Sequence, residues 1–407
     1  MAETVEGGGP TGQWRSEYTL LSACVGSYFA VRFAQVSVGA VVPLIIGTFD
    51  ISRGVLGAVL TGMWVAYALL QLPSGAIADR IGERLVILTA LVVTAGATLG
   101  LAVAPAFLLF GAGVVALGAG AGVYYNPATV LLSRSFDEIG RAIGIHRVGG
   151  QAAGVVAPVA AAAVAARYGW RPAIALGSLL AVAAAGSFVL TTTRMPPVSP
   201  DASLHKAFDT GVLLGLLDRS HTRITTSLMT IIEFVGLATM AFLPALLVEY
   251  YGLSLGQANL LFAVFFAVSA LCQPLSGWLS DQIGRDATAT ILATVGAVGY
   301  GALAVGGISP TGATIILALP AVVLAGATMS TTPVLQSRML DGLDASNRGA
   351  GFGLFRTLYL LVGATGTTVV GALADVAGWG PAFGLLAGLL AIMVLILVAI
   401  GAGDTDG

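Results

Sequence analysis

The amino-acid sequence predicts an all-α integral membrane protein whose twelve transmembrane helices form two pseudo-symmetric six-helix bundles. Its composition, its number of long apolar segments and a repeat at half its length carry this prediction. Hydrophobic residues make up 57% of the 407 residues and charged residues only 9%, with a mean hydropathy of +0.93. A soluble domain carries about 25% charged residues. The large apolar faces of this chain must therefore meet lipid.

The apolar segments are long enough to cross a bilayer, which takes about 20 residues of helix. In the first half we expect spans near residues 20–46, 54–74, 85–104, 107–132, 142–166 and 172–192. In the second half we expect them near 224–248, 256–279, 288–308, 311–337, 350–374 and 380–401. The predicted domains are an N-terminal tail (1–19), a first bundle (20–192), a polar cytoplasmic linker (193–223), a second bundle (224–401) and a C-terminal tail (402–407).

A short polar stretch occurs twice, once in each half of the chain. Residues Gly75–Arg84 (GAIADRIGER) recur 202 positions later as Gly277–Asp286 (GWLSDQIGRD), with Gly, Asp and Gly at the same spacings. Pro43 and Pro244 repeat at nearly the same offset. A half-length repeat in a hydrophobic chain is typical of a transporter built from two related bundles.

The first copy, Gly-x-x-x-Asp-Arg-x-Gly-x-Arg, resembles the signature of the major facilitator superfamily in the loop after the second span. The resemblance extends from about Leu20 to Ile400, and Gln282 departs from it in the second copy. It implies that the two halves alternate access to a central site. It names no substrate.

The resemblance also implies a role for the two polar loops. Asp79 would accept hydrogen bonds at the start of the eleventh helix, where the helix dipole favours negative charge. With Arg80 and Arg134 it would latch the halves together in the outward-facing state. The predicted latch residues are Gly75, Asp79, Arg80, Gly82, Arg84, Arg134, Gly277, Asp281, Gly284 and Arg285. The alternative is a solvated loop that only orients the protein, in which the glycines allow the chain to reverse.

Lysine and arginine in the loops predict the orientation. If the N-terminus is cytoplasmic, twelve of these residues lie on the inner side and three on the outer side. Cytoplasmic loops carry the excess of positive charge. We therefore expect both termini in the cytoplasm of a prokaryotic cell, with the protein in the cell membrane.

Four charged residues stand inside predicted spans, where an ionisable group is by default a functional hypothesis. Arg32 and Glu233 each lie 11 residues before the repeated prolines, Pro43 and Pro244. They therefore occupy equivalent positions in the first and seventh helices. Those helices line the central cavity in the resembled family, so Arg32 and Glu233 would face each other across the pathway.

Arg147 and Arg356 form a second matched pair, each 23 residues before a repeated tryptophan (Trp170 and Trp379). Pro127 is expected to interrupt the fourth helix and to free polar backbone groups there. The predicted substrate and proton pathway consists of Arg32, Gln35, Tyr124, Asn126, His146, Arg147, Glu233 and Arg356. The alternatives are structural ion pairs, arginines that snorkel to headgroups, and polar groups that join helices by hydrogen bonds.

The sequence carries no sign of an enzyme. It has no phosphate-binding Gly-Lys-Ser/Thr loop, no metal-ligand spacing among its three histidines and no basic tract for nucleic acid. We therefore expect no cofactor and no metal. Drug–proton antiporters of the resembled family often carry an Arg in the fourth helix, whereas this chain has no Arg or Lys between Arg84 and Arg134.

These observations favour a monomeric secondary active transporter of a small organic anion, coupled to protons through Glu233. Desolvation favours the protonated carboxyl and a nearby arginine favours the carboxylate. An anion bound to Arg32 would screen that arginine, and Glu233 would then take up a proton. The alternatives are a multidrug or metabolite efflux antiporter, which an apolar cavity would suit, and a receptor or sensor on a transporter fold.

Overall fold

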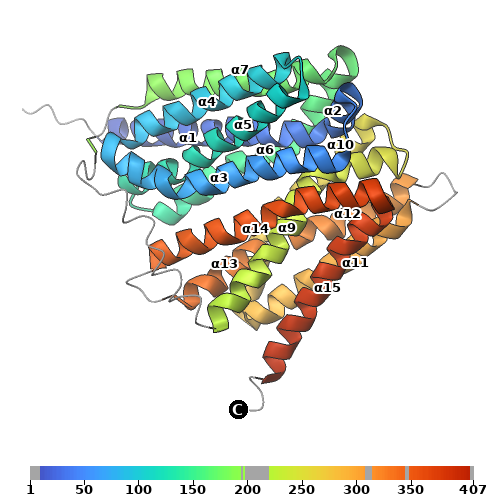
Figure 1. The fold of residues 1–407 in the computed structure, drawn as a ribbon. Coiled ribbons are helices and arrows are strands. Elements are labelled where there is room, and N and C mark those ends of the chain that lie inside the picture. Colours follow the sequence, from blue (N-terminus) through green and yellow to red (C-terminus); the bar gives the residue numbers. More distant parts are fainter. Residues whose placement is uncertain (1–9, 194–195, 198–219, 308–313, 344–347, 404–407) are drawn as a thin grey trace, which may run out of the picture.

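The computed structural model describes residues 10–193, 196–197, 220–307, 314–343 and 348–403, and all of its regular elements are helices. The first half contains α1 (Pro10–Ala40), α2 (Val42–Phe49), α3 (Arg53–Ile81), α4 (Glu83–Val103), α5 (Phe107–Ser135), α6 (Ile139–Tyr168) and α7 (Trp170–Thr191). The second half contains α9 (Ser220–Glu249), α10 (Leu255–Ile283), α11 (Arg285–Gly306), α12 (Thr314–Thr328), α13 (Thr331–Asp341), α14 (Arg348–Ala377) and α15 (Trp379–Gly403). Figure 1 shows the two halves as separate layers of helices.

The twelve predicted spans are confirmed, because twelve helical segments of the described residues are long and apolar enough to cross a membrane. Two of them are interrupted. The first is interrupted at Val41, just before Pro43, and the tenth is divided between α12 and α13, just before Pro333. Proline lacks the N–H that would continue the helical hydrogen bonds and is favoured in a first turn. The interruption predicted at Pro127 is wrong, since α5 runs straight through it.

The repeated polar stretch is helical, which corrects the prediction of a loop. Helix α3 continues to Ile81 and α4 begins at Glu83, so Gly82 alone joins them. Gly82 has φ +93° and Gly284, its equivalent between α10 and α11, has φ +89°. Only glycine adopts this backbone region readily. Gly75 and Gly277 lie within α3 and α10, where an added Cβ would meet no atom within 4 Å.

The two halves pack through small residues. Helix α3 lies along α14, and α6 lies along α10. A Cβ added at Gly54 would lie 3.1 Å from Cα of Ala372, and one at Gly154 would lie 2.6 Å from the Phe266 ring. Lipid gives no hydrophobic drive for helix association, so close backbone approach must supply the attraction. The hydroxyl of Thr61 adds a polar contact, 2.9 Å from the carbonyl oxygen of Ala364.

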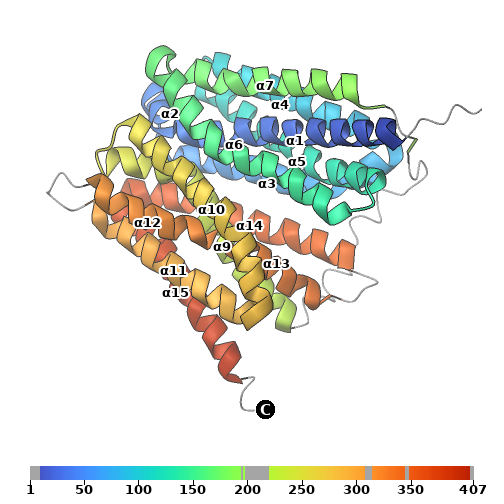
Figure 2. The same cartoon turned by 180° about the vertical axis from the view of Figure 1, so that it is seen from behind.

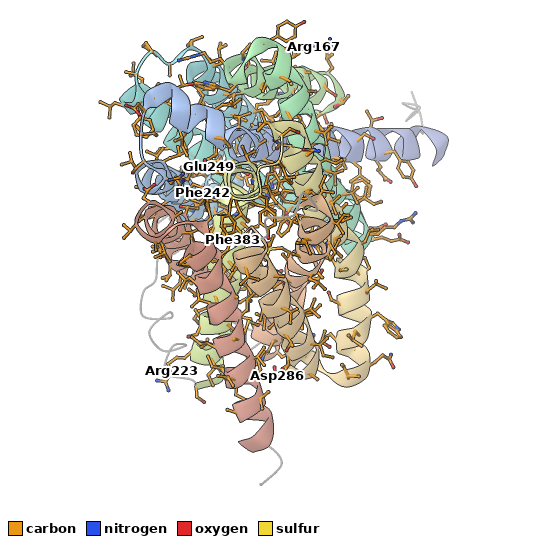
Figure 3. The ribbon with its side chains drawn as sticks, turned by 90° about the vertical axis from the view of Figure 1, so that its right-hand side faces the viewer. Arg167, Arg223, Phe242, Glu249, Asp286 and Phe383 are labelled. Carbon is orange, nitrogen blue, oxygen red and sulfur yellow. The ribbon has the colours of Figure 1, made fainter. Side chains whose placement is uncertain are left out.

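The halves meet at one end of the molecule and diverge toward the other (Figures 1 and 2). We call the first the closed end, defined by Arg53, Glu249 and Asp375, and the second the motif end, defined by Gly82 and Gly284. Figure 3 shows Arg223 and Asp286 far from Glu249, at the opposite end of the second half. Both copies of the repeated stretch therefore end on the same side of the protein.

Cysteine labelling should test the predicted orientation. In a Cys24→Ser, Cys272→Ser background, Arg80→Cys and Gln282→Cys place thiols at exposed positions of the motif end, and Ser52→Cys places one at the closed end. An impermeant maleimide added to intact cells should react with Ser52→Cys only. Arg80→Cys and Gln282→Cys should react only in inverted vesicles. Labelling of either from outside the cell would reverse the predicted topology.

Candidate functional site

A cavity of ≈ 210 Å³ lies between the two halves of the protein. Helices α1, α3 and α6 of the first half line it, together with α9, α10, α13 and α14 of the second. Its charged side chains are Arg32, Arg147, Glu233 and Arg356. Its aromatic side chains are Tyr28, Trp64, Tyr67, Phe265, Phe266 and Tyr359. All four charged residues predicted inside the spans thus contribute to one cavity.

Arg32 and Arg356 approach this cavity from opposite halves, and neither is paired with an acid among the described residues. Arg32 donates a hydrogen bond of 2.9 Å to Oε1 of Gln35, and its guanidinium lies 5.9 Å from the centre of the Trp64 ring. The guanidinium of Arg356 lies 5.2 Å from the centre of the Tyr125 ring. It donates no hydrogen bond to any described residue. Ring contacts hold both cations in place without neutralising them.

Glu233 is the only acid that lines the cavity in the described part of the chain. It has no ion-pair partner there within 4.0 Å, so the predicted Arg32–Glu233 pair shares the cavity without direct contact. Arg32 and Arg356 line the same cavity, and a nearby cation favours the charged form of a carboxyl group. Helix α14 packs closely behind Glu233, because a Cβ added at Gly363 would lie 2.7 Å from the Glu233 Cβ.

Tyr124 and His146 lie outside the cavity lining and are fully buried. The Tyr124 hydroxyl donates to the carbonyl oxygen of Cys24 at 2.7 Å, so the contact of 3.2 Å with His146 Nε2 requires that nitrogen to carry the donated proton. In the neutral ring Nδ1 of His146 then carries no proton and can only accept a hydrogen bond. It has no partner among the described residues. The His146 ring lies 4.9 Å from that of Tyr28, which does line the cavity. Tyr124 and His146 therefore pack behind Tyr28, a residue of the cavity wall.

Gln35 and Asn126 are also placed outside the cavity lining. Gln35 is 2% exposed and accepts the hydrogen bond from Arg32, so it positions that arginine. The amide of Asn126 donates to the carbonyl oxygen of Gln71 at 2.5 Å and joins α5 to α3.

Several lining residues were missed by sequence reasoning: Trp64, Tyr67, Gln151, Thr332 and Gln336. Trp64 and Tyr67 are three residues apart and so share a face of α3, which a search for helical spacing of aromatic residues could have found. Gln273 was not missed, because its match with Gln71 in the repeat made both of them weaker candidates, and of the two only Gln273 lines the cavity among the described residues. The remaining residues carry no signal that separates a cavity wall from an ordinary helix interface.

The closed end is held by a cluster that joins the two halves. Arg53 pairs with Glu249, and its Nη1 lies 3.2 Å from Oδ1 of Asp375. The Asp375 carboxylate also accepts the backbone N–H groups of Arg53 at 3.1 Å and of Gly54 at 2.8 Å. These amides belong to the first turn of α3, which has no intrahelical acceptors for them and favours a negative charge. An acid from the second half thus caps a helix of the first.

The ion pairs at the motif end stay within one half in the described part of the chain. Nη1 of Arg134 lies 2.6 Å from Oε1 of Glu83, and Nε of Arg338 lies 2.5 Å from Oδ1 of Asp286. Arg285 pairs with Asp341. The Asp79 side chain forms no hydrogen bond or ion pair with another described residue. The predicted latch of the motif end stays a prediction.

Three further charged residues lie at the motif end: Arg84, Arg80 and Asp281. Nε of Arg84 donates to the carbonyl oxygen of Thr192 at 3.0 Å and so ties α4 to the end of α7. Arg80 and Asp281 are exposed.

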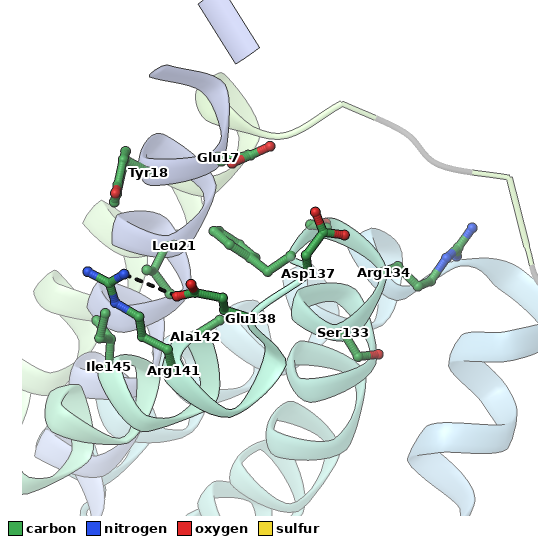
Figure 4. Close-up of a pocket in the computed structure, with 12 residues that line it drawn as sticks. Glu17, Tyr18, Leu21, Ser133, Arg134, Asp137, Glu138, Arg141, Ala142 and Ile145 are labelled. Carbon is green, nitrogen blue, oxygen red and sulfur yellow. Dashed lines mark hydrogen bonds and ion pairs between the residues drawn. The ribbon is translucent and has the colours of Figure 1, made fainter. Parts of the chain in front are cut away.

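A second pocket, of ≈ 480 Å³, lies near the motif end of the first half (Figure 4). The start of α1, the end of α5 and the start of α6 form it. Its Arg141 pairs with Glu138 at 3.1 Å, and both side chains are exposed. None of the described residues of the second half lines this pocket. Movement of one half against the other would not transfer a molecule bound there.

Comparison with known proteins decides the family. The family model described as Major Facilitator Superfamily matches residues 24–234 and again 224–405. The chain belongs to the major facilitator superfamily. It is therefore a multi-pass membrane transporter and not an enzyme. No curated protein matches the sequence.

Solved structures of superfamily members share the fold at low sequence identity. A variant of the nucleoside transporter NupG has a TM-score of 0.80 at 14% identity, over 94% of this chain and 99% of that one. A bacterial homologue of the human lysosomal transporter Spinster, in an inward-facing and unoccupied conformation, has a TM-score of 0.74 at 17% identity, over 97% and 96%. A D-xylose–proton symporter has a TM-score of 0.74 at 16% identity, over 94% and 96%.

Removal of the charge that caps α3 should loosen the closed end. Asp375→Asn keeps the size of the side chain but weakens its bonds to Arg53 and to the helix start, on the order of 1–2 kcal/mol. The population open at this end should rise about ten-fold. A reporter cysteine at the buried Ala364, in a background without Cys24 and Cys272, should then react about ten times faster with a methanethiosulfonate reagent.

The matched control is Asp137→Asn, which neutralises an exposed acid of the first half far from the closed end. It should leave the reporter rate unchanged. An equal reporter rate in Asp375→Asn and in the unmodified protein would mean that the cluster does not hold the closed end.

Proposed function

We propose that the protein is a secondary active transporter that moves a small organic anion together with a proton by alternating access. The observation that carries this proposal is the charge of the central cavity. Three arginines line it against one carboxylate, and none of the three forms an ion pair in the described part of the chain. Monomeric function in the cell membrane, with both termini in the cytoplasm, belongs to the same proposal.

The arginines support an anionic substrate. An uncompensated guanidinium attracts an anion far more strongly in a low-dielectric cavity than in water. Its planar fork of N–H donors also matches the geometry of a carboxylate. The same charges repel cationic drugs. The cavity of ≈ 210 Å³ is smaller than the ≈ 300–1,000 Å³ typical of pockets for drug-sized ligands, which favours a metabolite over multidrug efflux.

Glu233 supports coupling to protons. It is the one acid that lines the cavity in the described part of the chain, and nearby guanidiniums favour the charged form of a carboxyl group. An anion that binds Arg356 or Arg32 offsets their attraction for Glu233, so the carboxylate then takes up a proton. When the anion leaves, the attraction returns and the proton is released. Anion and proton thus travel together.

The two ends of the protein support alternating access. In the predicted orientation the motif end faces the cytoplasm, so a protein joined at its closed end is inward-facing. The Asp375 cap on α3 would stabilise this state, and the latch predicted for Asp79 at the start of α14 would stabilise the outward-facing one. The two contacts lie at opposite ends of the α3–α14 pair. Tilting one half of the protein against the other would therefore break one contact and form the other.

Transport in reconstituted vesicles tests the coupling. The variants are Glu233→Gln, Arg32→Gln and the double variant, assayed with radiolabelled lactate, succinate and benzoate. Glu233→Gln should abolish accumulation driven by a proton gradient but keep exchange across the membrane. Arg32→Gln should abolish both activities, because it removes an anion-binding group, and the double variant should recover neither.

The controls are Glu138→Gln and Arg141→Gln, which neutralise an exposed pair outside the cavity and should leave transport unchanged. Undiminished accumulation in Glu233→Gln would remove the acid from coupling. Recovery in the double variant would indicate a structural pair, because removal of one partner alone leaves a buried charge unpaired.

A further inference from the structure

Arg32 and Arg356 provide two separate anion-binding groups within the cavity. Arg32 belongs to α1 and is held by Gln35 and the Trp64 ring, while Arg356 belongs to α14 and is held by the Tyr125 ring. Each guanidinium has five N–H donors. Arg356 uses none of them on a described residue, and Arg32 uses Nη1 on Gln35, with Nη2 3.9 Å from the sulfur of Met240. Both keep donors available for a ligand.

The charges of these groups can be counted. Arg32 and Arg356 together with an ionised Glu233 leave one positive charge, and with a protonated Glu233 they leave two. A monocarboxylate therefore brings the site to neutrality with Glu233 still ionised, so it draws a proton to Glu233 less strongly than a dicarboxylate does. A dicarboxylate brings the site to neutrality only when Glu233 is protonated. A site of low dielectric disfavours net charge. Only a dicarboxylate makes the proton part of the neutral complex.

The other ionisable groups around Glu233 do not change this count. Tyr28 of α1, Tyr67 of α3 and Tyr359 of α14 line the cavity with phenol groups, a class of side chain that carries no charge near pH 7 in water. Helices α10 and α13 contribute only uncharged side chains. Arg147 of α6 also lines the cavity, but its side chain is exposed, so water and salt screen its charge.

We infer that the substrate is a short dicarboxylate, with one carboxylate on Arg32 and the other on Arg356, and that one proton accompanies it on Glu233. This inference rests on the proposed function and narrows its substrate class. The proton passes from the solution to the Glu233 carboxylate when the dianion binds, and back to the solution when it leaves. Because the two arginines belong to opposite halves, the dianion also links those halves.

Binding to the purified protein in detergent at pH 7 tests the inference. The probes are succinate, its monoamide succinamate, and butyrate, which have similar lengths and carry two, one and one negative charges. Succinate should bind at least about ten-fold tighter than either, because each carboxylate gains charge-assisted hydrogen bonds. Arg32→Gln and Arg356→Gln should each reduce this preference to about two-fold or less. Arg141→Gln, an exposed arginine, is the control and should keep it.

The number of protons taken up on succinate binding is a second measurement. It would not change if the arginines had only a structural role. In weakly buffered solution with a pH indicator, succinate should bring about one proton to the unmodified protein, and none to Glu233→Gln. Succinate binding without proton uptake would overturn the proposed stoichiometry. Equal affinities for succinate, succinamate and butyrate would overturn the dicarboxylate assignment and leave the proposed anion transport intact. If none of the three, nor malonate, glutarate or benzoate, binds, the proposed function fails as well.

Discussion

The cost of placing charge between two layers of helices in lipid is the constraint on which this protein depends. Each ionised side chain at this depth loses water and must gain a partner, a bound ion or a cavity. Arg32 and Arg356 have ring contacts, and Arg32 also bonds to Gln35, but neither they nor Glu233 form an ion pair in the described chain. The arginines thus give the cavity an excess of positive charge, which a bound anion offsets while Glu233 takes up a proton.

The two ends of the α3–α14 pair follow a second physical rule, the preference of a helix start for negative charge. At the closed end Asp375, near the end of α14, caps the first turn of α3. At the motif end the repeated stretch places Asp79 near the end of α3, on the side where α14 begins. The same chemistry is therefore available at both ends, with the roles of the two helices exchanged.

Much of this architecture follows from the sequence, because lipid imposes simple rules on length and polarity. The twelve spans and the half-length repeat needed only hydropathy and matched spacing from repeated prolines and tryptophans. The gathering of Arg32, Glu233 and Arg356 in one cavity also needed the resemblance to a family whose matching helices line such a cavity. The helical state of residues 75–81 was missed, since glycine and charge indicate a loop when tertiary support is unknown. The Asp375 cap was missed because its partners lie more than 300 residues away. His146 was assigned to the pathway from its neighbour Arg147, and its burial behind Tyr28 depends on packing.

The energies of these contacts suit a protein that must change shape. The Arg53 side chain is 31% exposed and those of Glu249 and Asp375 are 24% and 22% exposed, so water weakens each pair. Such partly exposed ion pairs contribute typically about 0–1 kcal/mol each. A fully buried pair at the closed end would hold one state so firmly that the differential affinity of a small ligand could not shift it, since moving a population from 1:99 to 99:1 takes about 5.5 kcal/mol. Weak contacts at the ends leave the balance of states to the charges at the centre, where the substrate binds.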